Sequence, residues 1–179
     1  MKRSINIAVI GLGQVGSYLL NELNTKKKDI ELKTGKKINI VAISARNINK
    51  KRQFKINKKI FFKDPLDIFK KTKVDIFFEA IGLSGGISKK VVETALKKKI
   101  HVITPNKALI SKHGNELAKM AELNNVNLEF EASVAGGIPI LRSIKEGLAT
   151  NKISKVYGIL NGTSNYILTE MENSNQSFS

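Results

Sequence analysis

Cysteine is absent from the 179-residue sequence. Its absence excludes disulfide bonds, thiolate metal sites and a cysteine nucleophile. Long apolar runs are also missing, and no segment approaches the roughly 20 apolar residues that a helix needs to cross a bilayer. The apolar run near the N-terminus, residues 5–11, is short and has no small-residue cleavage site behind it, so we expect no signal peptide and a cytoplasmic protein without a membrane partner. The length allows one good core and part of a second domain.

Arginine is scarce: it occurs only at Arg3, Arg46, Arg52 and Arg142, in a chain whose formal net charge is +16. The positive charge comes mainly from lysines spread through most of the expected helices. Arginine is the side chain that reads bases through paired hydrogen bonds, and the interleaving of aromatic and basic residues that would support a nucleic-acid binder is missing. Lysine, isoleucine and asparagine are all abundant and all have AT-rich codons, which explains much of the charge. We therefore expect no nucleic-acid partner; such a partner would bind with strongly salt-dependent affinity.

Segments with the patterns of buried strands and of amphipathic helices alternate over about 130 residues. Strands are expected at residues 4–10, 38–45, 58–62, 74–78, 100–103 and 126–130, and helices at residues 14–23, 65–71, 88–99 and 106–125. This alternation predicts an α/β fold in which a doubly wound parallel sheet, Rossmann-like, is covered by helices on both faces.

The character of the chain changes after Val134. Residues 135–139 read as a turn into a helix that extends to Leu148, followed by a strand at residues 152–160 and a helix at residues 161–172. We therefore predict a dinucleotide-binding domain over residues 1–134 and the start of a second, α+β domain over residues 135–179.

Glycines follow the first expected strand directly, in the motif GLGQVG of residues 11–16. Its setting between a strand and a helix is the one that the dinucleotide-binding fingerprint G-x-G-x-x-G requires. Gly11 would allow the tight turn, Gly13 would let the backbone approach a pyrophosphate, and Gly16 would let helix and strand pack closely. The helix N-terminus, which begins with Gln14 and Val15, would then offer free N–H groups to the pyrophosphate. The alternative is a turn without a ligand.

The end of the second expected strand indicates which nucleotide is bound. An acidic residue there would hold the ribose hydroxyls of NAD, but residues 44–47 read SARN and contain none. Arg46, followed by Lys50, Lys51 and Arg52, is suited to a 2′-phosphate because a guanidinium fork matches phosphate geometry. NADP is therefore the expected cofactor, with NAD as the second candidate. The alternative is a solvated basic loop.

Two further strand ends are expected at the same edge of the sheet, where ligands bind in open α/β folds. Ala80 and Ile81 follow one of them and are expected to line the nicotinamide side. Glu79 either shares that role or is a structural carboxylate that is hydrogen-bonded at the strand end. Lys107, in the segment TPNKAL of residues 104–109, is expected to project near the same crevice.

The segment EASVAGGIP, residues 131–139, places a carboxylate beside several turn carbonyls. Such hard oxygen ligands suit a small cation such as sodium. The alternative is a glycine-rich turn between domains, which we prefer from the residues alone.

Four segments together resemble homoserine dehydrogenase, in order and at similar spacing: residues 11–16, 104–109, 131–139 and 161–168. The resemblance spans nearly the whole chain. It implies an NAD- or NADP-dependent oxidoreductase that interconverts L-homoserine and L-aspartate 4-semialdehyde, in the pathway to threonine, methionine and isoleucine. It also implies a homodimer when the protein is full length, and a second domain that serves catalysis and dimerisation.

The resemblance also implies roles for individual residues. Lys107 would bind the nucleotide beside the nicotinamide and would favour the alkoxide-like oxygen during hydride transfer. Gly162 would close over the cofactor. The implied sodium site consists of the Glu131 carboxylate and the carbonyls of Val134, Gly136 and Ile138.

One departure from the family concerns the substrate. The family's substrate-binding Glu and Asp and its proton-shuttling Lys lie beyond the segment that matches residues 161–168, and the chain stops at Ser179 before reaching them. We therefore expect the 179 residues of this sequence, on their own, to bind nucleotide without turnover, because the groups for general acid catalysis and for substrate orientation are missing. The alternative is a non-catalytic NAD(P)-binding regulatory domain. A phosphorylating semialdehyde enzyme is excluded by the missing cysteine.

Overall fold

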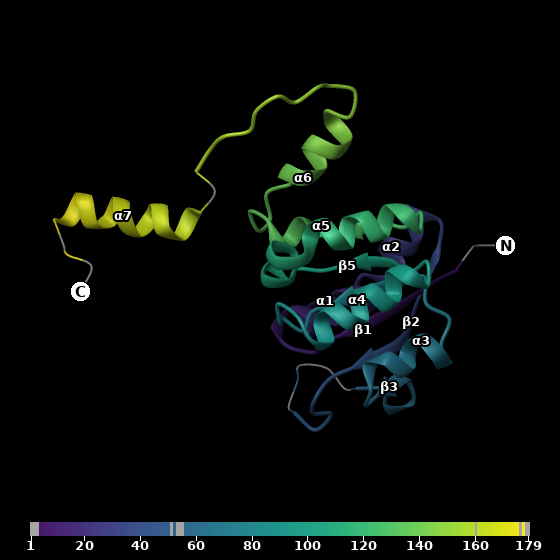
Figure 1. Ribbon diagram of the computed structural model, residues 1–179. Helices are drawn as coiled ribbons and strands as arrows, with labels where there is room; N and C mark the ends of the chain where they lie inside the picture. The colour runs from purple at the N-terminus through teal and green to yellow at the C-terminus, as the bar shows by residue number, and fades with distance from the viewer. Residues whose placement is uncertain (1–3, 51, 53–55, 160, 176, 178–179) are drawn as a thin grey trace. The chain divides into compact units, whose positions relative to one another are not determined.

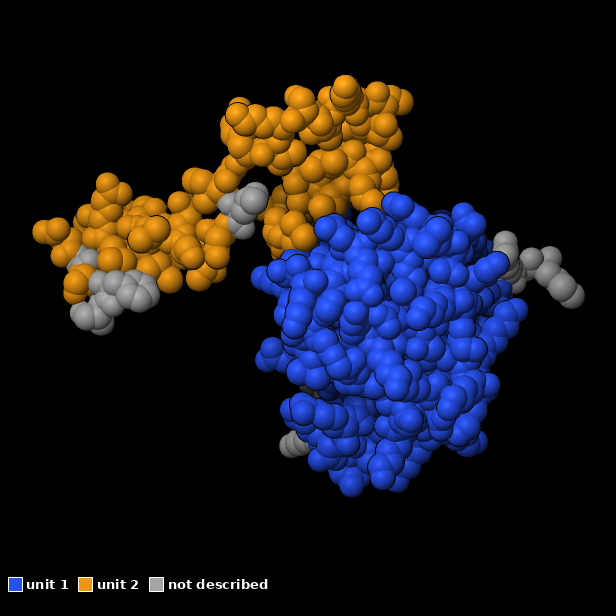
Figure 2. Space-filling view, viewed as in Figure 1, with its two compact units in different colours: residues 1–133 blue, residues 134–179 orange. Residues whose placement is uncertain are grey.

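The computed structural model describes residues 4–50, 52, 56–159, 161–175 and 177. The chain divides into two compact units, Met1–Ser133 and Val134–Ser179, which Figure 2 shows in blue and orange. Unit 1 carries the sheet and both of its cores, so each unit is described on its own below.

A six-stranded parallel sheet forms the centre of unit 1. The strands are β1 (Ser4–Ile10), β2 (Lys37–Ser44), β3 (Phe61–Phe62), β4 (Ile76–Glu79), β5 (His101–Ile103) and β6 (Leu128–Glu129). Their order in the sheet is β3-β2-β1-β4-β5-β6, so the direction of winding reverses between β1 and β4. The predicted doubly wound parallel sheet is confirmed, and the reversal point is where such sheets bind ligands.

Two hydrophobic cores lie on opposite faces of this sheet. Successive side chains of a strand point to opposite faces, and along β1 the residues Ile7 and Val9 belong to one core while Ala8 and Ile10 belong to the other. The first core includes Leu20 of α1 (Gln14–Thr25) and is bordered by α2 (Lys27–Thr34). The second is filled from three more helices, α3 (Ile68–Lys71), α4 (Ile87–Lys97) and α5 (Lys107–Leu123) (Figure 1). Helices therefore cover both faces, as the alternating pattern predicts.

Unit 2 contains helices but no strand among the residues that the structure describes. It consists of α6 (Ile140–Arg142), the short π-helix η4 (Ser143–Gly147) and α7 (Gly162–Ser174). The strand predicted at residues 152–160 is wrong for residues 152–159, which are irregular and exposed, and Leu160 lies outside the described residues. The error has a physical reason. β-branched residues favour an extended chain, but an extended segment is stable as a strand only when it is hydrogen-bonded to a neighbouring strand.

Within residues 4–50, 52, 56–159, 161–175 and 177, no helix is both long enough and apolar enough to cross a bilayer.

Candidate nucleotide-binding site

Two glycines of the motif at residues 11–16 are required by the packing of the turn itself. Gly11 leaves β1 with φ of +90°, a conformation that glycine adopts without strain. Its N–H donates to the carbonyl of Ser44 at 2.9 Å, and a Cβ built on it would lie 2.3 Å from the carbonyl oxygen of Ala80. Gly16 is buried, and a Cβ there would lie 2.0 Å from the carbonyl oxygen of Gly11. A side chain at either position would therefore force the backbone of the turn to move.

Gly13 differs from these two because the packing of the described residues does not require a glycine there. Its φ is −78°, and a Cβ on it would meet no atom of the described residues within 4 Å. Gly13 is exposed and is the N-cap of α1, where no side-chain hydrogen bond caps the helix among the described residues. The first hydrogen bond of α1 runs from the N–H of Ser17 to the carbonyl of Gly13 at 3.0 Å, so the helix does not use the N–H groups of Gln14 and Val15, both of which are exposed residues. This geometry is that of an anion site at a helix N-terminus, with room above Gly13 for the anion.

The carboxyl end of β2 lies beside this turn, as the Gly11–Ser44 hydrogen bond shows. Arg46 follows β2 and is exposed, so its guanidinium is accessible to a phosphate. Lys50 is exposed on the same loop, whereas Lys51 lies outside the described residues.

Arg52 was grouped with these basic residues by sequence, but the structure gives its side chain a different role. The guanidinium donates four hydrogen bonds, and each of the four acceptors is a main-chain carbonyl. The acceptors are Leu12 at 3.3 Å from Nε, Ile48 at 3.2 Å and Lys50 at 2.8 Å from Nη1, and Asn47 at 2.8 Å from Nη2. Most of its donors are therefore occupied by the protein's own backbone.

Glu79, the last residue of β4, is a fully buried structural carboxylate. Its Oε1 accepts the N–H of Ile81 at 2.8 Å, and its Oε2 accepts the hydroxyl of Thr104, at the end of β5, at 2.6 Å. Polar oxygens that are buried away from water cost free energy unless they are hydrogen-bonded in this way. Of the two readings of Glu79 from the sequence, the structural one is therefore correct. Ala80 and Ile81 follow it, half-buried, with the Ala80 carbonyl against Gly11.

Asn106 continues this network to the start of α5. Its side-chain nitrogen donates to the carbonyl of Leu83 at 2.9 Å and approaches Glu79 Oε1 at 3.4 Å. Its side-chain oxygen accepts the N–H of Leu109 at 3.1 Å, which caps the helix. Lys107 is the first residue of α5 and is exposed. The buried network therefore fixes the position from which Lys107 projects, at the edge that also holds the glycine turn.

The oxygen atoms expected to bind sodium are divided between the two units. Glu131 is half-buried and begins the short helix η3 (Glu131–Ser133) of unit 1, whereas Val134, Gly136 and Ile138 belong to unit 2. Within the described residues no group of three or more His, Cys, Asp or Glu side chains could hold a metal ion. A cation at this segment would therefore depend on main-chain carbonyls, and the sodium site stays a prediction.

Gly162 also lies in unit 2, where it is exposed and begins α7. The preceding Asn161 caps this helix, because its side-chain oxygen accepts the N–H of Ser164 at 3.0 Å. The expected contact of Gly162 with a cofactor stays a prediction.

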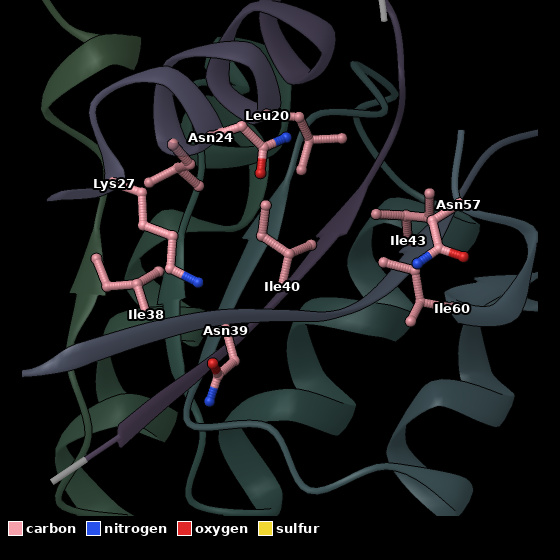
Figure 3. A pocket seen from close by; sticks show the side chains of 10 residues that line it. Leu20, Asn24, Lys27, Ile38, Asn39, Ile40, Ile43, Asn57 and Ile60 are labelled. Carbon is pink, nitrogen blue, oxygen red and sulfur yellow. The ribbon is translucent and has the colours of Figure 1, made fainter. Parts of the chain in front are cut away.

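A separate cavity of about 310 Å³ lies on a face of the sheet (Figure 3). Its walls come from α1, α2, β2 and η1 (Lys58–Ile60), and isoleucines of β2 contribute much of the lining. The lining residues are Leu20, Leu23, Asn24, Lys27, Ile38, Asn39, Ile40, Ile43, Asn57 and Ile60. None of them belongs to the glycine turn or to the ends of β4 and β5, so this cavity is not the candidate nucleotide site.

Sequence reasoning missed two features of the site. The four-carbonyl contact of Arg52 involves residues up to 40 positions apart, and no local pattern indicates it. The Glu79–Thr104–Asn106 network also depends on the pairing of β4 with β5. One part of it has a local signal, because Asn directly before a helix is a preferred N-cap.

The strand order, the closely packed glycine turn at the end of β1 and the open N-terminus of α1 define the class: unit 1 is a Rossmann-type dinucleotide-binding domain. Family models agree and are more specific. "Homoserine dehydrogenase, NAD binding domain" matches residues 11–131, and "Homoserine dehydrogenase" matches residues 139–179. The chain belongs to the homoserine dehydrogenase family.

Individual relatives cover nearly all of this chain. The homoserine dehydrogenase of Neisseria gonorrhoeae is 39% identical over 176 residues, which are 98% of this chain and 40% of the relative. That of Bacillus subtilis is 37% identical over 94% of this chain and 39% of its own length. A solved homoserine dehydrogenase from Thiobacillus denitrificans superposes with a TM-score of 0.82 at 35% identity, covering 99% of this chain and 41% of that one. This chain thus spans about 40% of the length of these relatives.

Proposed function

We propose that residues 1–134 form the nucleotide-binding domain of a homoserine dehydrogenase and that this domain prefers NADP to NAD. The observation that carries the proposal is the open space above Gly13, at the N-terminus of α1, between two glycines that the turn cannot do without. Arg46 at the end of β2, where an NAD-preferring domain would carry an acid, supports the preference for NADP.

Each part of the site has a distinct task in this proposal. The pyrophosphate binds the free amides at the start of α1, from Gln14 and Val15 onward, and Arg46 binds the 2′-phosphate. Ala80 and Ile81 line the nicotinamide side. Lys107 lies beside the nicotinamide, where its positive charge favours the negative charge that develops on the substrate oxygen. When bound, the nucleotide supplies or accepts the hydride.

The rest of the proposal concerns the full-length protein. The full-length protein interconverts L-homoserine and L-aspartate 4-semialdehyde, in the biosynthesis of threonine, methionine and isoleucine, and it acts as a homodimer. Residues 135–179 begin its catalytic and dimerisation domain, with Gly162 closing over the cofactor. Sodium binds at the Glu131 carboxylate and the carbonyls of Val134, Gly136 and Ile138. A polypeptide limited to these 179 residues binds nucleotide without turning over homoserine.

The test is a titration of NADPH and NADH into the purified chain, followed by the fluorescence of the bound nucleotide. We expect NADPH to bind more tightly than NADH, and Arg46→Ala to weaken NADPH by about tenfold or more while NADH changes little, because only NADPH carries the 2′-phosphate. Failure of both nucleotides to bind would refute the proposal.

A homoserine turnover assay separates the enzyme from a non-catalytic NAD(P)-binding regulatory domain. Both proposals predict binding without turnover for this polypeptide. Only the enzyme proposal predicts NADP-dependent oxidation of homoserine by a polypeptide that contains these residues together with the remaining length found in the relatives.

A further inference from the structure

The side chain of Arg52 joins two segments that are far apart in the sequence. Its Nε donates to the carbonyl of Leu12, inside the glycine turn, at 3.3 Å. Its two terminal nitrogens donate to three carbonyls of the loop after β2, those of residues 47, 48 and 50, at 2.8 to 3.2 Å. One guanidinium therefore links the turn at residues 11–16 to the loop at residues 46–50.

In the proposed function, both segments bind the adenosine half of the nucleotide. The turn binds the pyrophosphate, and the loop, through Arg46, binds the 2′-phosphate of the adenosine ribose. Both phosphates are attached to one ribose, which limits the distance between them, so the two segments must be held at a matching distance in the protein. The backbone hydrogen bond from Gly11 to Ser44 links them at the strand ends, and Arg52 is a second link further out on the loop.

We propose that Arg52 is a positioning residue that holds the loop after β2 against the glycine turn, and that it prepares the site for the adenosine half of the nucleotide without contacting the 2′-phosphate. This proposal rests on the proposed nucleotide-binding function. It assigns the phosphate contact to Arg46 and removes Arg52 from the set of phosphate ligands.

The chemistry of the guanidinium supports this division. Arginine has five N–H donors in a rigid planar fork, and four hydrogen bonds to carbonyls occupy most of them. A lysine carries the same charge but has three donors on one nitrogen, so it cannot span carbonyls on two segments in the same way. A loop that is already ordered loses less conformational entropy when the ligand binds.

The decisive variant is Arg52→Lys, which keeps the charge and removes the fork. A phosphate ligand and a positioning residue differ in what this change does to NADH, which lacks the 2′-phosphate. For a positioning residue, we expect Arg52→Lys to weaken NADH and NADPH alike, each by about tenfold, because both share the pyrophosphate and the adenine. The matched control is Arg142→Lys in unit 2, an exposed arginine that pairs with Glu146 at 3.4 Å, for which we expect no change in either affinity.

A second measurement does not depend on the nucleotide. Amide hydrogen exchange of the free protein reports opening of residues 11–16 and 46–50, and we expect Arg52→Lys to accelerate exchange there by about threefold or more while the sheet stays protected. If wild type binds neither nucleotide, the proposed function fails, and the exchange experiment alone decides whether Arg52 links the two segments. Loss of NADPH affinity with unchanged NADH affinity and unchanged exchange would identify Arg52 as a phosphate ligand and overturn the inference. Unchanged affinities and unchanged exchange would overturn it as well.

Discussion

Alanine substitutions at two glycines of the turn should separate folding from nucleotide binding. Gly16→Ala places a Cβ 2.0 Å from the carbonyl oxygen of Gly11, which is backbone and can move only if the turn moves. Overpacking usually lowers the free energy of unfolding by about 1–3 kcal/mol, and a clash with backbone belongs at the upper end, so we expect about 3 kcal/mol. Gly13→Ala places a Cβ where no atom lies within 4 Å in the part of the chain that the structure describes.

The stability of Gly13→Ala should be close to that of wild type. The φ of −78° is ordinary for alanine, so the substitution gains about 0.4–1 kcal/mol by restricting the unfolded chain. The loss of glycine at an N-cap costs about the same amount, because alanine is a poor residue there. We therefore expect a net change within about 0.5 kcal/mol in either direction. Nucleotide affinity should nevertheless fall by more than about tenfold, since the new methyl group occupies the space proposed for the pyrophosphate.

Urea unfolding and NADPH titration of the two variants provide the assay. Gly16→Ala should lose stability, whereas Gly13→Ala should lose binding and keep stability. Wild-type affinity in Gly13→Ala would refute the assignment of the space above this residue to the nucleotide. Unchanged stability in Gly16→Ala would show that the turn relaxes without cost and that its close packing is not a requirement.

Two further predictions concern the buried network and the surface of α4 and α5. Thr104→Val leaves a buried oxygen of Glu79 and the N–H of Asn106 without their partner, so we expect urea unfolding to show a loss of about 1–3 kcal/mol, with Thr104→Ser close to wild type. The hydrogen bond from Lys89, at 2.9 Å, lowers the pKa of Glu116 below its ordinary value. A lowered folded-state pKa adds stability above the unfolded pKa and loses it as pH falls through the folded value, so wild type should exceed Glu116→Gln in stability at neutral pH and lose that advantage in acid.

The parts of the fold that could be predicted are those with a local signal. Ile7 and Val9 alternate with Ala8 and Ile10 along a strand buried on both faces, and a glycine motif directly after such a strand has few other uses. The strand predicted at residues 152–160 shows the limit of the same reasoning. Apolar and β-branched residues there resemble a strand, but the pattern cannot tell whether a partner strand is present to pair with it.

The parts of the site that could not be predicted depend on contacts between distant segments. Arg46 and Arg52 look alike in the sequence, as two arginines on one basic loop. Their environments separate them, because Arg46 is exposed while Arg52 donates to carbonyls of two segments. The sequence likewise left Glu79 with two readings, and only its full burial and its hydrogen bond to Thr104 distinguish between them.

The candidate site is thus fixed by side chains that do not face the proposed ligand. On the adenosine side, Arg52 holds the loop that carries Arg46. On the nicotinamide side, Glu79 and Asn106 hold the start of the helix that carries Lys107. A ligand that meets an ordered site spends less of its interaction energy on immobilising loops and side chains, and this cost is about 0.5–1.5 kcal/mol for each flexible side chain that binding orders. Substitutions of these supporting residues should therefore weaken NADH and NADPH together, whereas substitution of Arg46 should change the preference between them.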